Sequence, residues 1–193
     1  MDYKVMAKAI SLRLGSVLVD VVHPNQTYTV LGRSIFDNLY LVWDLLELGC
    51  RDGPSFALLS LDQEKAFDRV DHRLNWTLTE PVSFGQGVRQ GCPLSGQLYA
   101  LVIEPFLYLL RRRLTGLVLR EPELRLVLSV YADDVLLVVQ DWGDLARVEA
   151  CQAIYSAASS ARVNWVKSSG LVRPEVHHEV PLLFAKLHSR KQD

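Results

Sequence analysis

The pattern of apolar and polar residues divides the chain into helices and strands of ordinary length. Apolar residues repeat at spacings of three and four, the period of an amphipathic helix, over residues 2–22, 34–48, 95–113 and 144–161. Shorter apolar runs predict strands at residues 26–30, 56–61 and 115–120 and a hairpin over Leu126–Val139. Helices and strands alternate irregularly and the strongest strand pair is antiparallel, so we expect an α+β fold.

The same spacing predicts which side of each helix faces the core. In the first helix the predicted core face carries Met6, Ile10, Leu14, Val17 and Val21. In the second it carries Ile35, Leu39, Val42, Trp43 and Leu46, and in the last Leu145, Val148, Cys151 and Tyr155. Ser34 with Asp37 resembles a capping box at the start of the second helix, and Gly49 predicts its end.

Composition limits the class of protein. Hydrophobic residues make up 49% of the 193 residues and charged residues 22%, which allows a packed core. With 21 basic and 22 acidic residues the net charge is −1, so the charge balance gives no support for nucleic-acid binding. The three cysteines form no close pair, which argues against a disulfide framework or a zinc site and indicates a reducing compartment.

The sequence shows no sign of a membrane or secretory segment. No apolar run approaches the roughly 18 residues that a membrane-spanning helix needs. Charged residues within the first helix argue against a secretory signal. We therefore expect an intracellular protein, nuclear or cytoplasmic, with no membrane partner, and no pattern points to a specific protein partner.

The tip of the predicted hairpin is the first candidate for chemistry. Two apolar runs flank Tyr131, Ala132, Asp133 and Asp134. Adjacent carboxylates resist joint ionisation, and a divalent metal would remove that conflict. A solvated turn is the alternative, because aspartate is common in turns. The hairpin alone does not decide between the two.

A third carboxylate and a glycine-rich loop extend this candidate. Asp62 directly follows the apolar run 56–61, so pairing of that strand with the hairpin would bring Asp62, Asp133 and Asp134 to one end of a sheet. Hard oxygen ligands with open positions suit Mg²⁺ shared with substrate phosphates. Glycines in residues 85–95 leave room for a nucleotide. Alternatively, Asp62 caps a helix and the loop only turns the chain.

Three stretches occur in the order of reverse transcriptase motifs A, B and C: LSLDQEKAFDRVDH (59–72), GVRQGCPLSGQLY (87–99) and YADD (131–134). DYKVMAKAISLRL and HPNQTYTVLGRSIFDN upstream resemble the fingers of these enzymes, and VNWVKS (163–168) resembles motif D. The matches span about residues 2 to 170. The chain resembles the reverse transcriptases of non-LTR, LINE-type retrotransposons.

This resemblance implies a right-hand polymerase palm with partial fingers, an antiparallel sheet backed by helices, and no thumb. It implies RNA-directed DNA synthesis, with an RNA template, a DNA primer and deoxynucleoside triphosphates (dNTPs) as partners, by two-metal transfer to the primer 3′-OH. Asp62, Asp133 and Asp134 would be the catalytic residues and the ligands of Mg²⁺ or Mn²⁺.

Further residues match the family's motifs around the incoming nucleotide: Arg33, Phe67, Gln90, Gly91 and Lys167. The resemblance implies that Phe67 is an aromatic steric gate that excludes a ribose 2′-OH. Arg33 would meet the triphosphate, and Lys167 would donate a proton to pyrophosphate. Tyr131 would pack near the primer end.

The chain departs from the family between motifs A and B. Only 25 residues lead from Asp62 to Gly87, where family members carry a further helix and strand, so an internal block is expected to be missing near residues 72–75. Its loss should loosen the carboxylate geometry and impair activity. We expect a reverse transcriptase-like domain over residues 1–170 and an unrelated tail, with disorder left open, over 171–193.

Three functions stay open from the sequence. The first is an RNA-directed DNA polymerase domain of a retrotransposon-derived protein. The second is a non-catalytic remnant of a retrotransposon reading frame, either truncated or spliced. The third is a nucleic-acid-binding module without catalysis, which the charge balance does not favour.

Overall fold

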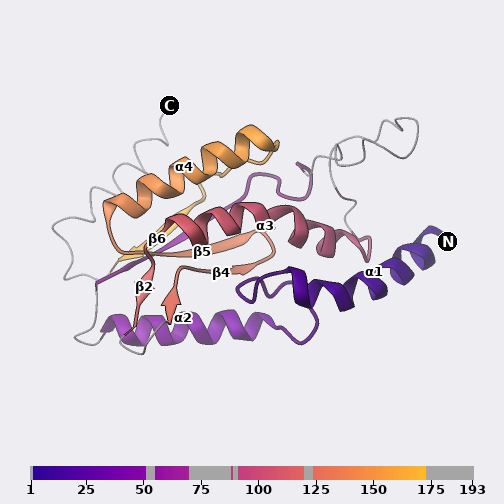
Figure 1. The fold of residues 1–193 in the computed structure, drawn as a ribbon, viewed down its shortest axis with the longest axis horizontal. Helices are drawn as coiled ribbons and strands as arrows, with labels where there is room; N and C mark the ends of the chain where they lie inside the picture. Colours follow the sequence, from indigo (N-terminus) through magenta and orange to yellow (C-terminus); the bar gives the residue numbers. More distant parts are fainter. Residues whose placement is uncertain (1, 51–54, 70–87, 89–90, 120–123, 173–193) are drawn as a thin grey trace.

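The computed structural model of the chain describes residues 2–50, 55–69, 88, 91–119 and 124–172. In chain order its elements are α1 (Asp2–Val21), α2 (Ile35–Cys50), β1 (Ala57–Leu61), α3 (Ser95–Arg113), β2 (Leu117–Val118), β3 (Arg125–Leu126), β4 (Leu128–Tyr131), β5 (Asp134–Val139), α4 (Trp142–Ala158) and β6 (Ser169–Val172) (Figure 1). This mixture of helices and antiparallel strands agrees with the predicted α+β class. Among the described helices, none is both long enough and apolar enough to cross a membrane.

A four-stranded antiparallel sheet in the order β4-β5-β1-β6 forms the centre of the fold. β1 pairs with β5, the pairing on which convergence of the three carboxylates depends, with Leu59 opposite Leu137 and Leu61 opposite Val135. Four of the five residues of β1 are buried and apolar, which is typical of a strand covered on both faces. The short strands β2 and β3 pair separately.

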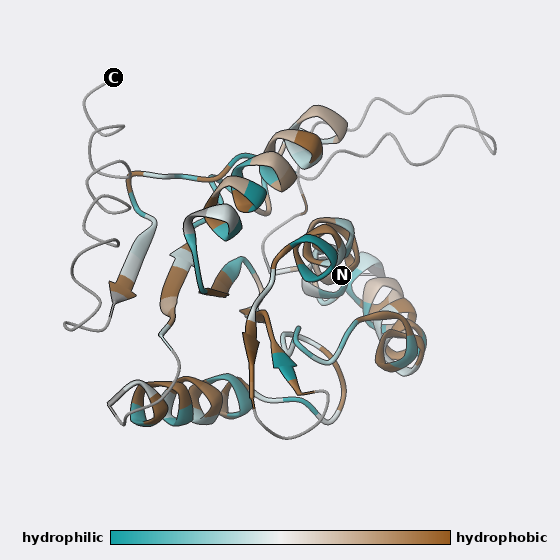
Figure 2. Ribbon diagram, turned by 60° about the vertical axis from the view of Figure 1, so that its left-hand side comes forward, coloured by the Kyte–Doolittle hydropathy of each residue, from teal (hydrophilic) through white to brown (hydrophobic). Residues whose placement is uncertain are grey.

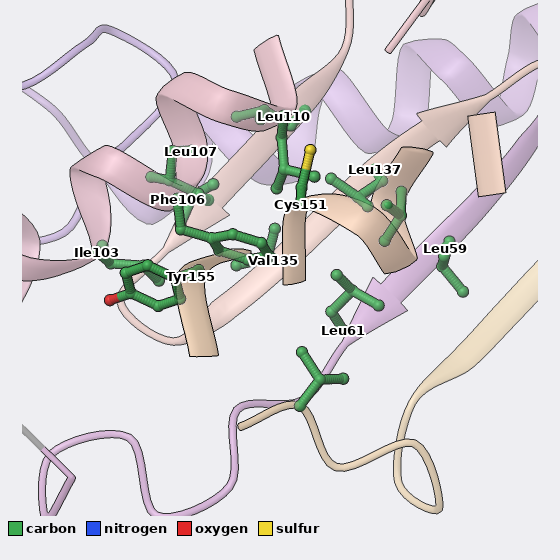
Figure 3. Close-up of a cluster of buried hydrophobic side chains, with 14 of the residues drawn as sticks. Leu59, Leu61, Ile103, Phe106, Leu107, Leu110, Val135, Leu137, Cys151 and Tyr155 are labelled. Carbon is green, nitrogen blue, oxygen red and sulfur yellow. The ribbon is translucent and has the colours of Figure 1, made fainter. Parts of the chain in front are cut away.

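Helices cover both faces of this sheet (Figures 1 and 2). On one face, side chains of β1 and β5 pack against α3 and α4, and Figure 3 shows Phe106 and Tyr155 within this cluster. The two rings stack with centroids 5.0 Å apart. On the other face, Leu45 of α2 packs with Leu58 and Val138. The sheet is therefore the middle of three layers, and the helices cover its faces rather than the ends of its strands.

The helices predicted from periodicity over residues 95–113 and 144–161 are present as α3 and α4. α3 spans residues 95–113 as expected, and the predicted face of α4 is buried at Leu145, Val148, Cys151 and Tyr155. α4 begins at Trp142, two residues before the predicted start, because the side chain of Asp141 accepts a hydrogen bond from the Asp144 N–H at 2.7 Å.

The predicted core faces of α1 and α2 are wrong. Most of the side chains expected in the core are exposed: Met6, Ile10, Val17, Val21, Ile35, Leu39, Trp43 and Leu46. Trp43 is 72% exposed whereas Leu45 is 2% exposed. Both helices carry apolar residues around most of their circumference, so spacing alone does not single out the buried side.

Tertiary contacts decide the rotation of these two helices. On the side of α1 that faces α3, the Ser11 hydroxyl donates to the Pro93 carbonyl at 3.2 Å. A Cβ at Gly15 would lie 3.2 Å from Nε2 of Gln97, so α1 and α3 approach closely at this point. In α2 the amide of Asn38 bonds to β4 and turns that side of the helix inward.

The structure also differs from the predictions in a predicted strand, a predicted helix end and a strand that was not predicted. Residues 26–30 form no strand, since only Gln26 pairs, in one parallel bridge with Val130. α2 continues through Gly49 to Cys50. β6 was missed, because its short sequence SGLV carries little strand signal, yet it pairs with β1. The expected tail, apart from residues 171 and 172, and residues 85–87, 89 and 90 of the 85–95 loop lie outside the described residues.

Two neighbouring leucines of α2 test the corrected core face. Replacing Leu45 with alanine should lower the free energy of unfolding by about 2–5 kcal/mol, because a buried leucine is removed. Leu46→Ala, the matched control, should cost less than about 1 kcal/mol because Leu46 is 39% exposed. Urea denaturation of both variants measures the difference, and a larger loss for Leu46→Ala would contradict this placement.

Candidate functional site

The three predicted carboxylates lie at one end of the central sheet. β1 ends at Leu61, which lies opposite Val135 in β5. Asp62 therefore follows β1 at the end where Asp134 begins β5. Asp133 is the second residue of the two-residue turn that joins β4 to β5, where Tyr131 pairs with Asp134. The register brings together residues that are about seventy positions apart in the chain.

Electrostatic coupling shows that these carboxylates are close enough to influence one another. Burial raises the pKa of Asp134, and the negative charges of Asp133 and then Asp62 raise it further. Burial also raises the pKa of Tyr99, with smaller contributions from Asp133 and Asp134. The end of the sheet thus concentrates negative charge, which a cation would stabilise.

The donor set suits a hard divalent cation, but its side chains are not gathered around one point. Within the described residues, no three Asp, Glu, His or Cys side chains are close enough together to hold a metal ion. Carboxylate oxygens are the ligands that Mg²⁺ prefers, and mutual repulsion is what a cation would relieve. Metal ligation by Asp62, Asp133 and Asp134 stays a prediction, and it requires these side chains to turn toward one another.

The turn itself has an unusual backbone. Ala132, its first residue, has φ of 56°, in the left-handed region that costs a residue with a Cβ about 1–2 kcal/mol. The buried side chain of Gln26 binds both peptide groups of this residue. Its Nε2 donates to the Ala132 carbonyl at 3.2 Å, and its Oε1 accepts from the Ala132 N–H at 3.2 Å. Contacts from a distant loop therefore offset the strain.

Further polar contacts hold the same loop against β4. The Thr27 N–H donates to the Val130 carbonyl at 3.1 Å, and the Val130 N–H donates to the Asn25 carbonyl at 2.9 Å. Nδ2 of Asn38, in α2, donates to the Ser129 hydroxyl at 2.7 Å and to the Val130 carbonyl at 3.1 Å. The edge of the sheet next to the turn is thus tied to the segment between α1 and α2.

Two aromatic pairs flank the carboxylates. The ring of Phe67 stacks on buried Tyr99 of α3 with centroids 4.5 Å apart and an interplanar angle of 26°. Tyr28 meets Tyr131 edge to face at 5.1 Å. A Cβ at Gly96 would come within 2.8 Å of the Tyr28 ring, so glycine at this position lets α3 approach the aromatic residues.

The segment that resembles motif D is bonded to the start of the Asp62 loop. The Asp62 N–H donates to the Ser168 hydroxyl at 3.2 Å, and the Asn164 N–H donates to the Asp62 carbonyl at 2.8 Å. Lys167 lies in this segment and is exposed. The structure therefore places Lys167 in a loop that contacts Asp62.

The remaining predicted residues do not join the carboxylates directly. The guanidinium of Arg33 donates four hydrogen bonds to the carbonyls of Val19, Val22, His23 and Gln26, at 2.8–3.1 Å. In this conformation Arg33 fixes the backbone after α1, and its contact with a nucleotide stays a prediction. Gly91 is exposed with φ of 79°, a conformation that favours glycine. Gln90 lies outside the described residues.

Sequence reasoning assigned no role to four residues that the structure places around the turn: Gln26, Tyr28, Asn38 and Tyr99. Three of them lie in the stretch HPNQTYTVLGRSIFDN and the fourth in the motif B match. The only signal for them was membership of those stretches. Their contacts join positions more than thirty residues apart, so local periodicity could not reveal them.

Comparison with known families identifies the kind of domain. Residues 1–183 match the family described as “Reverse transcriptase (RNA-dependent DNA polymerase)”. The match includes α1, α2, the central sheet, and both α3 and α4. It confirms the family resemblance deduced from the three ordered motifs.

A transposon protein is among the relatives. The “Transposon TX1 uncharacterized 149 kDa protein” of Xenopus laevis is 59% identical over 202 aligned residues, which include 89% of this chain and 15% of the relative. The chain thus spans about 15% of the length of that protein. A transposon relative agrees with the resemblance to retrotransposon enzymes.

The same similarity shows that this chain is shorter than its relative within the aligned region. Coverage of 89% corresponds to about 172 of the 193 residues, whereas the alignment has 202 positions. The difference is about 30 positions at which the relative has residues without a counterpart here.

Removal of one charge tests the electrostatic coupling. In metal-free buffer at neutral pH, Asp134→Asn should raise Tm by about 1–3 °C, because it relieves repulsion from Asp133 and Asp62 at a largely solvated position. Asp44→Asn on α2 is the matched control and should leave Tm unchanged. Differential scanning calorimetry measures both, and a decrease in Tm for Asp134→Asn would contradict the coupling.

Proposed function

Because the chain belongs to the reverse transcriptase (RNA-dependent DNA polymerase) family, we propose that it provides the palm and part of the fingers for RNA-directed DNA synthesis by a retrotransposon protein. The observation that carries the proposal is the β1–β5 register, which sets Asp62 beside the turn that contains Asp133. Its substrates would be an RNA template, a DNA primer and dNTPs.

The proposed chemistry is two-metal transfer of a nucleotide to the primer 3′-OH. Asp62, Asp133 and Asp134 would hold the ions, either Mg²⁺ or Mn²⁺, and orient the reacting groups. Bound divalent ions supply the charge that stabilises the transferring phosphoryl group and lower the pKa of the attacking hydroxyl. The negative charges of Asp133 and Asp62, which raise the pKa of Asp134 together with its burial, support this role because a cation would relieve that repulsion.

The aromatic pairs would shape the sites for the nucleotide and the primer. Phe67 would act as the steric gate, and its stacking on Tyr99 supports this because a buried neighbour restricts where the ring can move. Tyr131 would pack near the primer end, held at its edge by Tyr28. Exclusion of a ribose 2′-OH would then depend on the Phe67 ring, which Tyr99 of α3 holds in place by stacking.

Other residues would act on the nucleotide from the surrounding loops. Gln90 and Gly91 would pack on the base, and the positive φ of Gly91 supports a backbone that can approach closely. Lys167 would donate a proton to pyrophosphate from the segment bonded to Asp62. Arg33 would reach the triphosphate only after it exchanges carbonyl partners for phosphate oxygens.

A non-catalytic remnant of a retrotransposon reading frame is the second candidate function. Two observations favour it: about 30 aligned positions have no counterpart in this chain, and the described carboxylates are not grouped for a metal. A deletion of that size agrees with the block expected near residues 72–75, which lie outside the described part of the chain. In this proposal residues 1–170 form the reverse transcriptase-like domain and residues 171–193 form a separate tail.

Primer extension separates the two candidates. On an RNA template with a DNA primer, the full chain should extend the primer in the presence of Mg²⁺ or Mn²⁺ and not in the presence of a chelator. Asp133→Asn should lower the rate by at least about 100-fold, because a ligand of the ions is lost. Asp44→Asn serves as the control. Equal extension by the wild type and Asp133→Asn would contradict catalysis at Asp133, and no extension by either would favour the remnant.

Nucleotide selection tests the steric gate. Phe67→Val should raise the use of ribonucleotides relative to deoxynucleotides by about 10-fold or more, because a smaller side chain leaves room for the 2′-OH. Phe56→Val, which alters a partly buried phenylalanine at the opposite end of β1, is the control. The ratio of kcat/KM for the two sugars is the measurement, and an unchanged ratio in Phe67→Val would remove the assigned role.

A further inference from the structure

Gln26 is a buried polar residue whose side chain binds both the N–H and the carbonyl of one residue in the hairpin turn. Gln26 is 0% exposed, and both the nitrogen and the oxygen of its side-chain amide make hydrogen bonds. Nε2 donates to the Ala132 carbonyl, and Oε1 accepts from the N–H groups of Ala132 and Tyr28 at 3.2 and 3.0 Å. Two of these three hydrogen bonds go to Ala132, so the buried amide binds both backbone groups of one residue in the turn.

We propose that Gln26 is a positioning residue that sets the direction of the Asp133 carboxylate, and this rests on the proposed function of that carboxylate as a metal ligand. The Ala132 carbonyl that Gln26 binds belongs to the peptide group that leads into Asp133. Rotation of this peptide would swing the Asp133 side chain. Holding it fixed therefore fixes where the carboxylate points.

Glutamine suits this position for chemical reasons. Only a side chain with a donor and an acceptor side by side can bind the N–H and the carbonyl of the same residue. Glutamate would lose the donor and would add a negative charge next to Asp133 and Asp134. Methionine would fill the space but would leave both Ala132 groups without their partner, although Ala132 is held at a positive φ.

The loop that carries Gln26 is itself fixed, so the contact can transmit position. Asn25 and Thr27 bond to the backbone of Val130 on either side of Gln26, and Asn38 of α2 bonds both Thr27 and β4. The position of the Ala132 peptide is thereby linked to α2, the helix on the face of the sheet away from α3 and α4. Gln26 thus joins the segment between α1 and α2 to the turn of the sheet.

A second buried glutamine provides the matched control. Gln152 is buried on α4, and its amide donates only within that helix, to the Ser156 hydroxyl at 2.8 Å. Replacing either glutamine with methionine removes a buried amide. Only Gln26→Met removes contacts with the turn, so a loss that is merely structural would be shared by both variants.

The test measures Mn²⁺ affinity by electron paramagnetic resonance of the free ion, on the full 193-residue chain. Amide exchange at Ala132 and thermal unfolding are recorded for the same samples. Gln26→Met should weaken Mn²⁺ binding by about 10–100-fold, as expected when the support of a ligand is removed, and should speed exchange of the Ala132 amide. Gln152→Met should keep the wild-type Mn²⁺ affinity and Ala132 exchange, because its amide bonds only to Ser156.

Asp133→Asn separates failure of this inference from failure of the proposed function. If Asp133→Asn loses Mn²⁺ binding while folded Gln26→Met keeps it, the positioning role is overturned and the metal site stands. If Asp133→Asn binds Mn²⁺ as the wild type does, both are overturned. Equal weakening in Gln26→Met and Gln152→Met would also overturn the inference.

Discussion

The antiparallel register between β1 and β5 is the constraint on which the rest of the structure depends. Leu61 opposite Val135 places Asp62 at the end of the sheet where the β4–β5 turn lies. A slip of one residue would exchange the two faces of a strand, and both faces here are covered, by α3 and α4 on one side and α2 on the other. The fit of these apolar side chains in two different layers therefore fixes the position of the carboxylates.

The sequence predicted the parts of the fold that local patterns determine. β1, the hairpin, α3 and α4 have apolar runs with clear limits, and the motif order identified Asp62, Asp133 and Asp134 together. The rotation of α1 and α2 could not be predicted, because it depends on distant contacts such as Asn38 with β4. For the same reason Gln26 and Tyr99 were missed as neighbours of the site.

Two supports act on the candidate site, and they come from different kinds of interaction. The apolar register brings Asp62 to the turn, whereas polar contacts from Gln26 and Asn38 hold the turn itself. About 30 positions of the transposon relative have no counterpart in this chain, and no three described acidic, histidine or cysteine side chains lie close enough together to hold a metal ion. The chain thus contains the carboxylates that a metal site needs, whereas their side chains are not arranged around one point.

Paramagnetic broadening by Mn²⁺ tests the central claim most directly. At low Mn²⁺ concentration the amide signals of Asp62, Asp133 and Asp134 should broaden first, because the effect falls steeply with distance from the ion. Signals of Ala57 and Val139, paired at the opposite end of β1 and β5, should stay sharp. Uniform broadening along β1 and β5, or broadening centred elsewhere in the chain, would contradict a metal site at this end of the sheet.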